Sequence, residues 1–395
     1  MEPVLYLDHA ATTPVLPEAL EEFVRVCREL YANPSSLHGA GAAAARRLEE
    51  ARSELRRAAG AEGYRVVWTA TGTESNHLGI QGLARRLRGR VRPRTPRVLA
   101  GALEHPAALE AARALEAEGF RVETVPADRE GRILPEALEP LLDGDVVLVA
   151  VQWVNNELGS LHPVAALVER VRRRAPQAAF HVDAVQALGK IRPTVASTGA
   201  DSVAVAAHKI GGVRGCAALF LREGGPEPRP LFRGGGHEGG LRSGTENVAG
   251  AAAFARAARL RREALESEPE RFLRRRRLLL EALRRAHPGL RVLGPEAEDR
   301  IQGGILSCAF PGAPAEPLLH HLESQGVLVG SGSACHRHGA SDSPVLVALG
   351  LPRELRSSVL RFSLSGSETE AELRRAGEAV ARALRELRVA APGGG

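Results

Sequence analysis

A lysine at the end of a predicted buried strand is the residue best suited to covalent chemistry in this sequence. Residues 201–207 are mostly small or β-branched and predict a strand, which His208-Lys209 and the glycine turn Gly211-Gly212 follow. Of the 53 lysine and arginine residues, only Lys190 and Lys209 are lysines. A lysine amine can lose its proton and form an imine, whereas an arginine cannot. We therefore expect Lys209 to react with a carbonyl group, with a surface anchor as the alternative.

An aspartate and a glycine-containing turn could share one crevice with Lys209. Asp183 ends another apolar run, and the carboxyl ends of parallel strands meet at one edge of a sheet. An aspartate that keeps a pyridinium nitrogen protonated and a lysine that forms a Schiff base are the two groups that a pyridoxal 5'-phosphate (PLP) site requires. Residues 69–74 follow a strand and open a helix, so they could bind the phosphate. Taken alone, an aspartate at a strand end is more often a cap or a turn residue, and a Gly-Thr pair before a helix usually serves only in capping.

Predicted strands and helices alternate along the first part of the chain, and they must position these residues. Apolar runs predict strands at 65–69, 97–101, 121–125, 146–152, 179–184, 201–207 and 216–221. Helical patterns occupy 17–30, 42–59, 74–88, 105–118, 135–142 and 162–174. This alternation predicts the α/β class, with a mostly parallel seven-stranded sheet flanked by helices.

The pattern changes near residue 250. A long helical pattern spans 250–286 and is broken near Pro269; short strands are predicted at 290–293, 303–310, 326–329 and 359–364, and a last helix at 368–388. We predict a large PLP-binding domain over 15–250. A smaller α+β domain is predicted from 1–14 together with 251–395.

Composition argues against several other classes of protein. A hydrophobic content of 44% and a charged content of 25% are typical of a soluble globular protein. The net charge is +6, but arginines alternate with glutamates and aromatic residues make up only 4%, so no nucleic-acid surface is expected. No apolar run approaches the roughly 18 residues of a membrane span, and the N-terminus lacks the plan of a signal peptide. The four cysteines include no CxxC pair, so we expect a cytoplasmic protein without a metal site.

A series of motifs runs through nearly the whole chain. They are YLDHAATTP (6–14), NPSSLH (33–38), TESN (73–76), EH (104–105), VNNELG (154–159), HVDAVQ (181–186), HK (208–209), RSGTEN (242–247), SGSAC (331–335) and RFS (361–363). In this order they resemble the cysteine desulfurases, the NifS/IscS-like branch of the class V aminotransferases. These are PLP enzymes of fold type I.

The resemblance implies roles in holding the cofactor. Lys209 would form the imine and then move the substrate Cα proton, and Asp183 would pair with the pyridinium nitrogen. His105 would stack on the ring and take part in proton transfer. The residues near the phenolic oxygen would be Asn156 and Gln186. Those at the phosphate would be Gly72, Thr73 and His208, with Thr245 from the other subunit of a homodimer.

The resemblance also implies the reaction. Arg361, with Asn156 beside it, would bind the carboxylate of L-cysteine through its bidentate fork. Cys335 lies in a polar stretch that we expect to be flexible, and nearby cations favour its thiolate. The thiolate would attack the substrate sulfur, which releases L-alanine and leaves a persulfide on Cys335. A sulfur-acceptor protein, such as an iron–sulfur scaffold, would then receive the sulfur.

Departures from the family's pattern leave alternatives open. Ala206-Ala207 stand where Ser-Gly is usual, so one hydrogen bond to the phosphate, worth roughly 1.5–3 kcal/mol, is missing. Gly239 replaces the usual arginine, and Thr71-Gly72 the common Gly-Ala. The alternatives are a selenocysteine lyase, another class V PLP enzyme, or a sulfur-assembly scaffold without catalytic activity. The acceptor pathway, whether iron–sulfur clusters, tRNA thiolation or a thio-cofactor, stays open.

Overall fold

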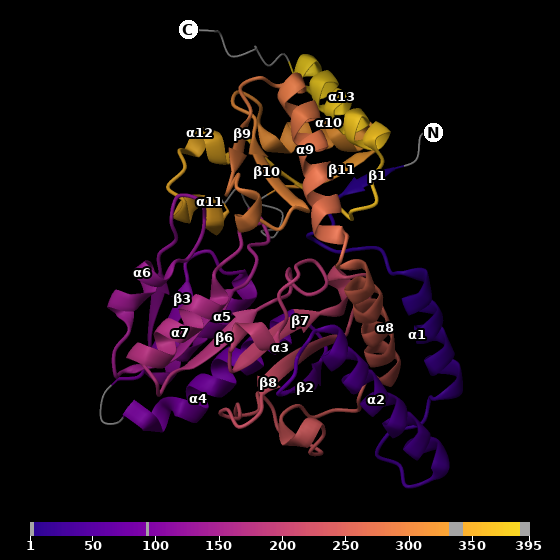
Figure 1. Cartoon of the computed structure of the whole chain (residues 1–395), viewed down its shortest axis with the longest axis vertical. Coiled ribbons are helices and arrows are strands. Elements are labelled where there is room, and N and C mark those ends of the chain that lie inside the picture. The colour runs from indigo at the N-terminus through magenta and orange to yellow at the C-terminus, as the bar shows by residue number, and fades with distance from the viewer. Residues whose placement is uncertain (1–3, 92–94, 332–342, 388–395) are drawn as a thin grey trace.

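The computed structural model describes residues 4–91, 95–331 and 343–387, which form two β-sheets with helices around them (Figure 1). The larger sheet has seven strands in the order β2-β8-β7-β6-β5-β3-β4. Their bounds are β2 Tyr64–Thr69, β3 Arg97–Gly101, β4 Arg121–Val125, β5 Val146–Gln152, β6 Ala179–Asp183, β7 Ser202–Ala206 and β8 Ala217–Arg222. All seven strands were predicted to within two residues at each end.

Six strands of this sheet run in one direction. Only β8 runs against its neighbours, pairing antiparallel with both β2 and β7. Asp183 of β6 pairs in register with Gln152 of β5 on one side and with Ala204 of β7 on the other. The α/β prediction is therefore confirmed, and the carboxyl ends of β2, β5, β6 and β7 meet at one edge of the sheet.

Helices cover both faces of the larger sheet, which explains why its strands are apolar on both sides. Helices α1 (Pro17–Glu29), α2 (Gly39–Ala58) and α8 (Val248–Ala264) pack together on one face (Figure 1). On the other face, α4 (Leu83–Leu87) and α5 (Pro106–Arg113) share a core with β3 and β5. Helices α6 (Pro135–Leu138) and α7 (Val164–Arg174) follow β4 and β5 along the chain.

The helix predicted at 74–88 is not regular. It begins as α3 (Gly72–His77), widens into a π turn at Leu78–Gly82 and continues as α4. The π turn lies beside the buried His181 ring, which a Cβ atom on Gly79 would overlap. Packing against His181, which the helical pattern does not reveal, accounts for this difference.

The smaller sheet has five strands in the order β1-β11-β12-β10-β9. Their bounds are β1 Leu5–Leu7, β9 Arg291–Leu293, β10 Ile305–Ala309, β11 Val327–Ser331 and β12 Val359–Ser363. The indigo β1 lies beside the orange β11 in Figure 1 and pairs with it in parallel, with Leu5 opposite Val327, although the two strands come from opposite ends of the chain. The N-terminal strand thus belongs to a sheet built otherwise from the C-terminal part of the chain.

Helices α9 (Glu268–Ala286), α10 (Ala315–Ser324) and α13 (Glu370–Glu386) accompany this sheet, with short helices α11 (Pro344–Ala348) and α12 (Arg353–Arg356). The break predicted near Pro269 is confirmed, because α8 ends at Ala264 and Pro269 lies in the first turn of α9. Helices α10 to α12 were not predicted. The domain boundary at residue 250 stays a prediction. None of the helices in the described ranges combines the length and the hydropathy that a membrane span requires.

Candidate active site

A cavity of about 430 Å³ lies at the edge where β2, β5, β6 and β7 end. This volume is within the roughly 300–1,000 Å³ of small-molecule sites. The predicted residues that line it are Gly72, Thr73, His105, Asn156, Asp183, Gln186, His208, Lys209 and Arg361. Thr245 is exposed and is not among the described lining residues. Cys335 and its predicted flexible stretch lie outside the described residues.

Lys209 is held by the N-terminal segment of the chain. It ends a 3-10 turn, Ala207–Lys209, that directly follows β7. Its Nζ donates hydrogen bonds to the backbone oxygens of Ala10 and Ala11, each at 2.7 Å. The amine therefore lies at the sheet edge predicted for it, with its position set by a segment about 200 residues earlier in the chain.

Asp183 ends a chain of buried hydrogen bonds. Its Oδ2 accepts from Asn76 Nδ2 at 2.7 Å, and Asn76 Oδ1 lies 2.9 Å from His181 Nε2. Burial lowers the pKa of His181 to about 3, so the ring is neutral. Because Asn76 Oδ1 can only accept, His181 Nε2 carries the proton, and its Nδ1 accepts from the Ser202 hydroxyl at 2.8 Å. The chain fixes the Asn76 amide so that its NH₂ group faces the carboxylate.

Two histidines at the cavity are held neutral. Burial lowers the pKa of His105; the Asp183 carboxylate acts against this, and the charges of Lys209 and Arg361 act with it. His105 Nδ1 accepts from Ala107 N at 3.1 Å, so the neutral ring carries its proton on Nε2. Burial and then the Lys209 charge lower the pKa of His208 to about 4.

Arg361 on β12 connects the two sheets at the cavity. Its Nη2 donates to Asp8 Oδ1 at 2.8 Å, and its Nη1 donates to the backbone oxygen of Asn156 at 2.9 Å. Arg361 is only 7% exposed, and its Nε has no partner among the described residues. The Oδ1 of Asn156 is likewise buried without a partner in that set. Donor and acceptor capacity is thus left over at this wall of the cavity.

The turn after β2 forms another wall. Thr71 caps α3 by accepting from Glu74 N at 3.0 Å, and Glu74 Oε1 accepts from Arg242 Nε at 2.9 Å. A Cβ on Gly72 would lie 3.0 Å from Val185 Cγ2 and 3.5 Å from the Ala206 Cβ. Ala206 therefore lies directly beside this turn, where the family's usual serine would place its hydroxyl.

Glu157 is a buried carboxyl on the cavity wall that sequence reasoning did not single out. Its Oε2 accepts from the Ser343 hydroxyl at 2.7 Å. Burial raises the pKa of Glu157 to about 7, and the Ser343 hydrogen bond and the Arg361 charge oppose this only in part. Of the described residues on either side of 332–342, Ser331 lines the cavity and Ser343 contacts the lining residue Glu157.

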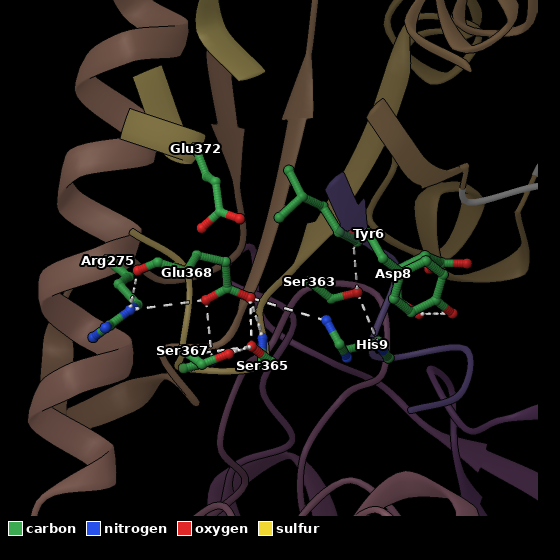
Figure 2. Close-up of polar contacts among 12 residues, drawn as sticks. Tyr6, Asp8, His9, Arg275, Ser363, Ser365, Ser367, Glu368 and Glu372 are labelled. Atoms are coloured by element: carbon green, nitrogen blue, oxygen red, sulfur yellow. Dashed lines mark hydrogen bonds and ion pairs between the residues drawn. The ribbon is translucent and has the colours of Figure 1, made fainter. Parts of the chain in front are cut away.

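The segment that holds Lys209 is itself anchored to β12. Ala10 N donates to Ser363 Oγ at 2.8 Å, and His9 N donates to the Ser363 backbone oxygen at 3.2 Å. Figure 2 shows the His9 ring directed toward Glu368, with Nε2 and Oε1 separated by 4.0 Å. The loop around Glu368 is bound to α9, since Arg275 Nε donates to the Glu368 backbone oxygen at 2.8 Å.

The cavity fits PLP in four respects. Lys209 supplies an amine and Asp183 a carboxylate at neighbouring strand ends. The turn at Gly72 opens a helix, whose first N–H groups have no intrahelical acceptor and favour an anion. Arg361 adds a guanidinium to the lining of the same cavity. The missing hydroxyl at Ala206 is the one feature that weakens this fit.

Comparison with known proteins agrees with this geometry. Residues 5–375 match the family model described as Aminotransferase class-V. The chain is 33% identical to the cysteine desulfurase IscS of Dictyoglomus turgidum, over 99% of this chain and 97% of that protein. The chain belongs to the cysteine desulfurase family of class-V aminotransferases. This family uses PLP.

Two solved structures have the same fold as this chain. One described as a NIFS-like protein covers 97% of this chain and all of its own, with a TM-score of 0.88 and 31% identity. Another, described as SspA in complex with cysteine, covers 92% of this chain and all of its own, with a TM-score of 0.78 and 26% identity.

Several residues that shape the site had no role assigned from the sequence. Asn76, Glu157 and Asp8 stand within the quoted motifs, which was the available signal for them. Backbone acceptors such as Ala10 carry no signal in their residue type. Cys216 and Cys308 are buried, and burial raises the pKa of each thiol to about 12.

Proposed function

We propose that this protein is a PLP-dependent cysteine desulfurase that converts L-cysteine to L-alanine and leaves a persulfide on Cys335. The observation that carries the proposal is the meeting of Lys209, Asp183 and Arg361 in one cavity. An amine for a carbonyl cofactor, a carboxylate for its ring nitrogen and a guanidinium for an amino acid carboxylate are together suited to amino acid chemistry on PLP.

Lys209 would attach the cofactor, and Asp183, oriented by Asn76, would hold its ring nitrogen protonated. The turn at Gly72 and Thr73, together with His208, would bind the phosphate, with Thr245 contributed by a second copy of the chain. Asn156 and Gln186 would donate near the phenolic oxygen, and neutral His105 would stack on the ring. Bound PLP would withdraw the negative charge that develops at the substrate Cα.

Arg361 would bind the substrate carboxylate, with Asn156 beside it. Lys209 would accept the Cα proton as a neutral amine and return a proton to the product. The Cys335 thiolate would attack the substrate sulfur, so that an S–S bond forms and the Cβ–S bond breaks. The methyl group of alanine takes up the proton lost by the thiol. The persulfide would then be passed to a sulfur-acceptor protein.

The test is turnover of L-cysteine with alanine and sulfide measured separately. We expect the wild type to release one alanine for each sulfur, and Cys335→Ala to release neither at a comparable rate in the presence of a thiol reductant. Cys27→Ala is the matched control, because Cys27 is exposed on α1 and lies outside the cavity. A wild type that binds PLP without turnover would favour a scaffold, and full activity in Cys335→Ala would exclude the persulfide route.

A further inference from the structure

The second lysine of the chain contacts a residue of the cavity. Lys190 Nζ donates to Gln186 Oε1 at 2.8 Å, and Gln186 Nε2 donates to the Ala10 backbone oxygen at 2.8 Å. The same Ala10 oxygen accepts from Lys209 Nζ at 2.7 Å. Both lysines of a chain that otherwise uses arginine are therefore joined through Gln186 and one carbonyl group.

The chemistry of these partners fixes the Gln186 amide. An ammonium group can only donate and a backbone carbonyl can only accept, so Oε1 must face Lys190 and Nε2 must face Ala10. Gln186 is 5% exposed, and a buried amide oxygen without a donor costs about 1–3 kcal/mol. Nε2 has two hydrogens and Ala10 takes one. The side chain thus keeps a second N–H donor available at the cavity that it lines.

The Lys190 charge also acts on the pKa values of two histidines, His208 and His9. Its charge is among those that lower the pKa of His208, after burial and the Lys209 charge. It also acts on His9, whose pKa burial lowers first and Glu368 raises. His208 precedes Lys209, and His9 precedes Ala10.

We propose that Lys190 is a positioning residue that holds Gln186 with its amide N–H groups toward the cavity and the Ala10 carbonyl. This inference rests on the proposed function, in which Gln186 donates to the phenolic oxygen of PLP. Lys190 acts through Gln186 and does not itself need to touch the cofactor or the substrate.

The first test needs no cofactor. The chain has six glutamines, so selective ¹⁵N-glutamine labelling gives few side-chain NH₂ signals, and Gln186→Leu identifies those of Gln186. In PLP-free protein, Lys190→Met is expected to shift the Gln186 signals and speed their exchange with water. Arg192→Met is the control, because this exposed cation lies two residues away and contacts Glu266 and Glu270 instead. Unmoved Gln186 signals in Lys190→Met would overturn the proposal.

The second test is the equilibrium dissociation constant of PLP. We expect Lys190→Met to weaken PLP binding about tenfold, as loss of one oriented hydrogen bond would. In the Gln186→Leu background the same substitution should have a much smaller effect, since only the Lys190 charge near His208 is then lost. An undiminished effect in that background would overturn the proposal, since Lys190 would then act independently of Gln186. If the wild type binds no PLP, the proposed function fails, while the signals of the PLP-free protein still decide whether Lys190 orients Gln186.

Discussion

Arg361 and Asp8 form an ion pair of 2.8 Å that joins β12 to the segment after β1 at the cavity wall. The pair orients a buried guanidinium whose Nε has no partner among the described residues. The backbone oxygen of Asn156 accepts a hydrogen bond from Arg361 Nη1, so the guanidinium is held from two sides. The substrate carboxylate would therefore meet a cation that is already oriented.

Arg361→Lys is expected to raise the KM for L-cysteine by tenfold or more with a smaller change in kcat. A lysine cannot reproduce the planar fork and makes a single point contact. Steady-state kinetics of alanine formation measure the effect. Arg353→Lys, on the exposed helix α12, is the matched control and should leave KM unchanged. An unchanged KM in Arg361→Lys would remove this residue from substrate binding.

Glu157→Gln should change how stability depends on pH. Burial raises the pKa of Glu157 to about 7, so the folded state binds its proton more tightly than the unfolded state does. The stability that this group contributes is complete below pH 4.5 and is lost as pH rises to about 7. As pH rises from mildly acidic to mildly basic, we expect the free energy of unfolding of Glu157→Gln to increase by about 1–3 kcal/mol relative to that of the wild type.

Urea unfolding over this pH window measures that gain. Glu118→Gln is the control, because hydrogen bonding from Arg85 holds the pKa of Glu118 below its usual range, so it is ionised throughout. The difference in stability between Glu118→Gln and the wild type should stay flat. A flat difference for Glu157→Gln as well would mean that Glu157 titrates normally.

Ala206→Ser should strengthen PLP binding. The new hydroxyl would lie beside Gly72 at the proposed phosphate site, where it adds a hydrogen bond to a charged group, worth roughly 1.5–3 kcal/mol. We expect a dissociation constant at least about tenfold lower, measured by absorbance titration of PLP-free protein. Ala207→Ser is the control, because Ala207 is buried and is not among the described lining residues. Equal or weaker binding by Ala206→Ser would place the phosphate elsewhere.

The sequence predicted the positions of Lys209 and Asp183 because a strand end is a local feature. Apolar runs identify the strands, and parallel topology brings their carboxyl ends together. The contacts that orient these residues depend on long-range packing instead. Ala10 contributes a backbone oxygen, which no residue type announces, and the π turn beside His181 follows from a contact between distant segments. Glu157 stands within a quoted motif, but its raised pKa arises from burial that only the folded structure shows.

The central claim is that Lys209, and not Lys190, carries the cofactor. Borohydride reduction of PLP-loaded protein, followed by mass mapping of peptides, tests it directly, since only these two lysines can be modified on a side chain. We predict that the pyridoxyl mass appears on the peptide containing Lys209 and is absent from the peptide containing Lys190. Its appearance on Lys190, or its absence from both peptides in protein supplied with ample PLP, would contradict the account.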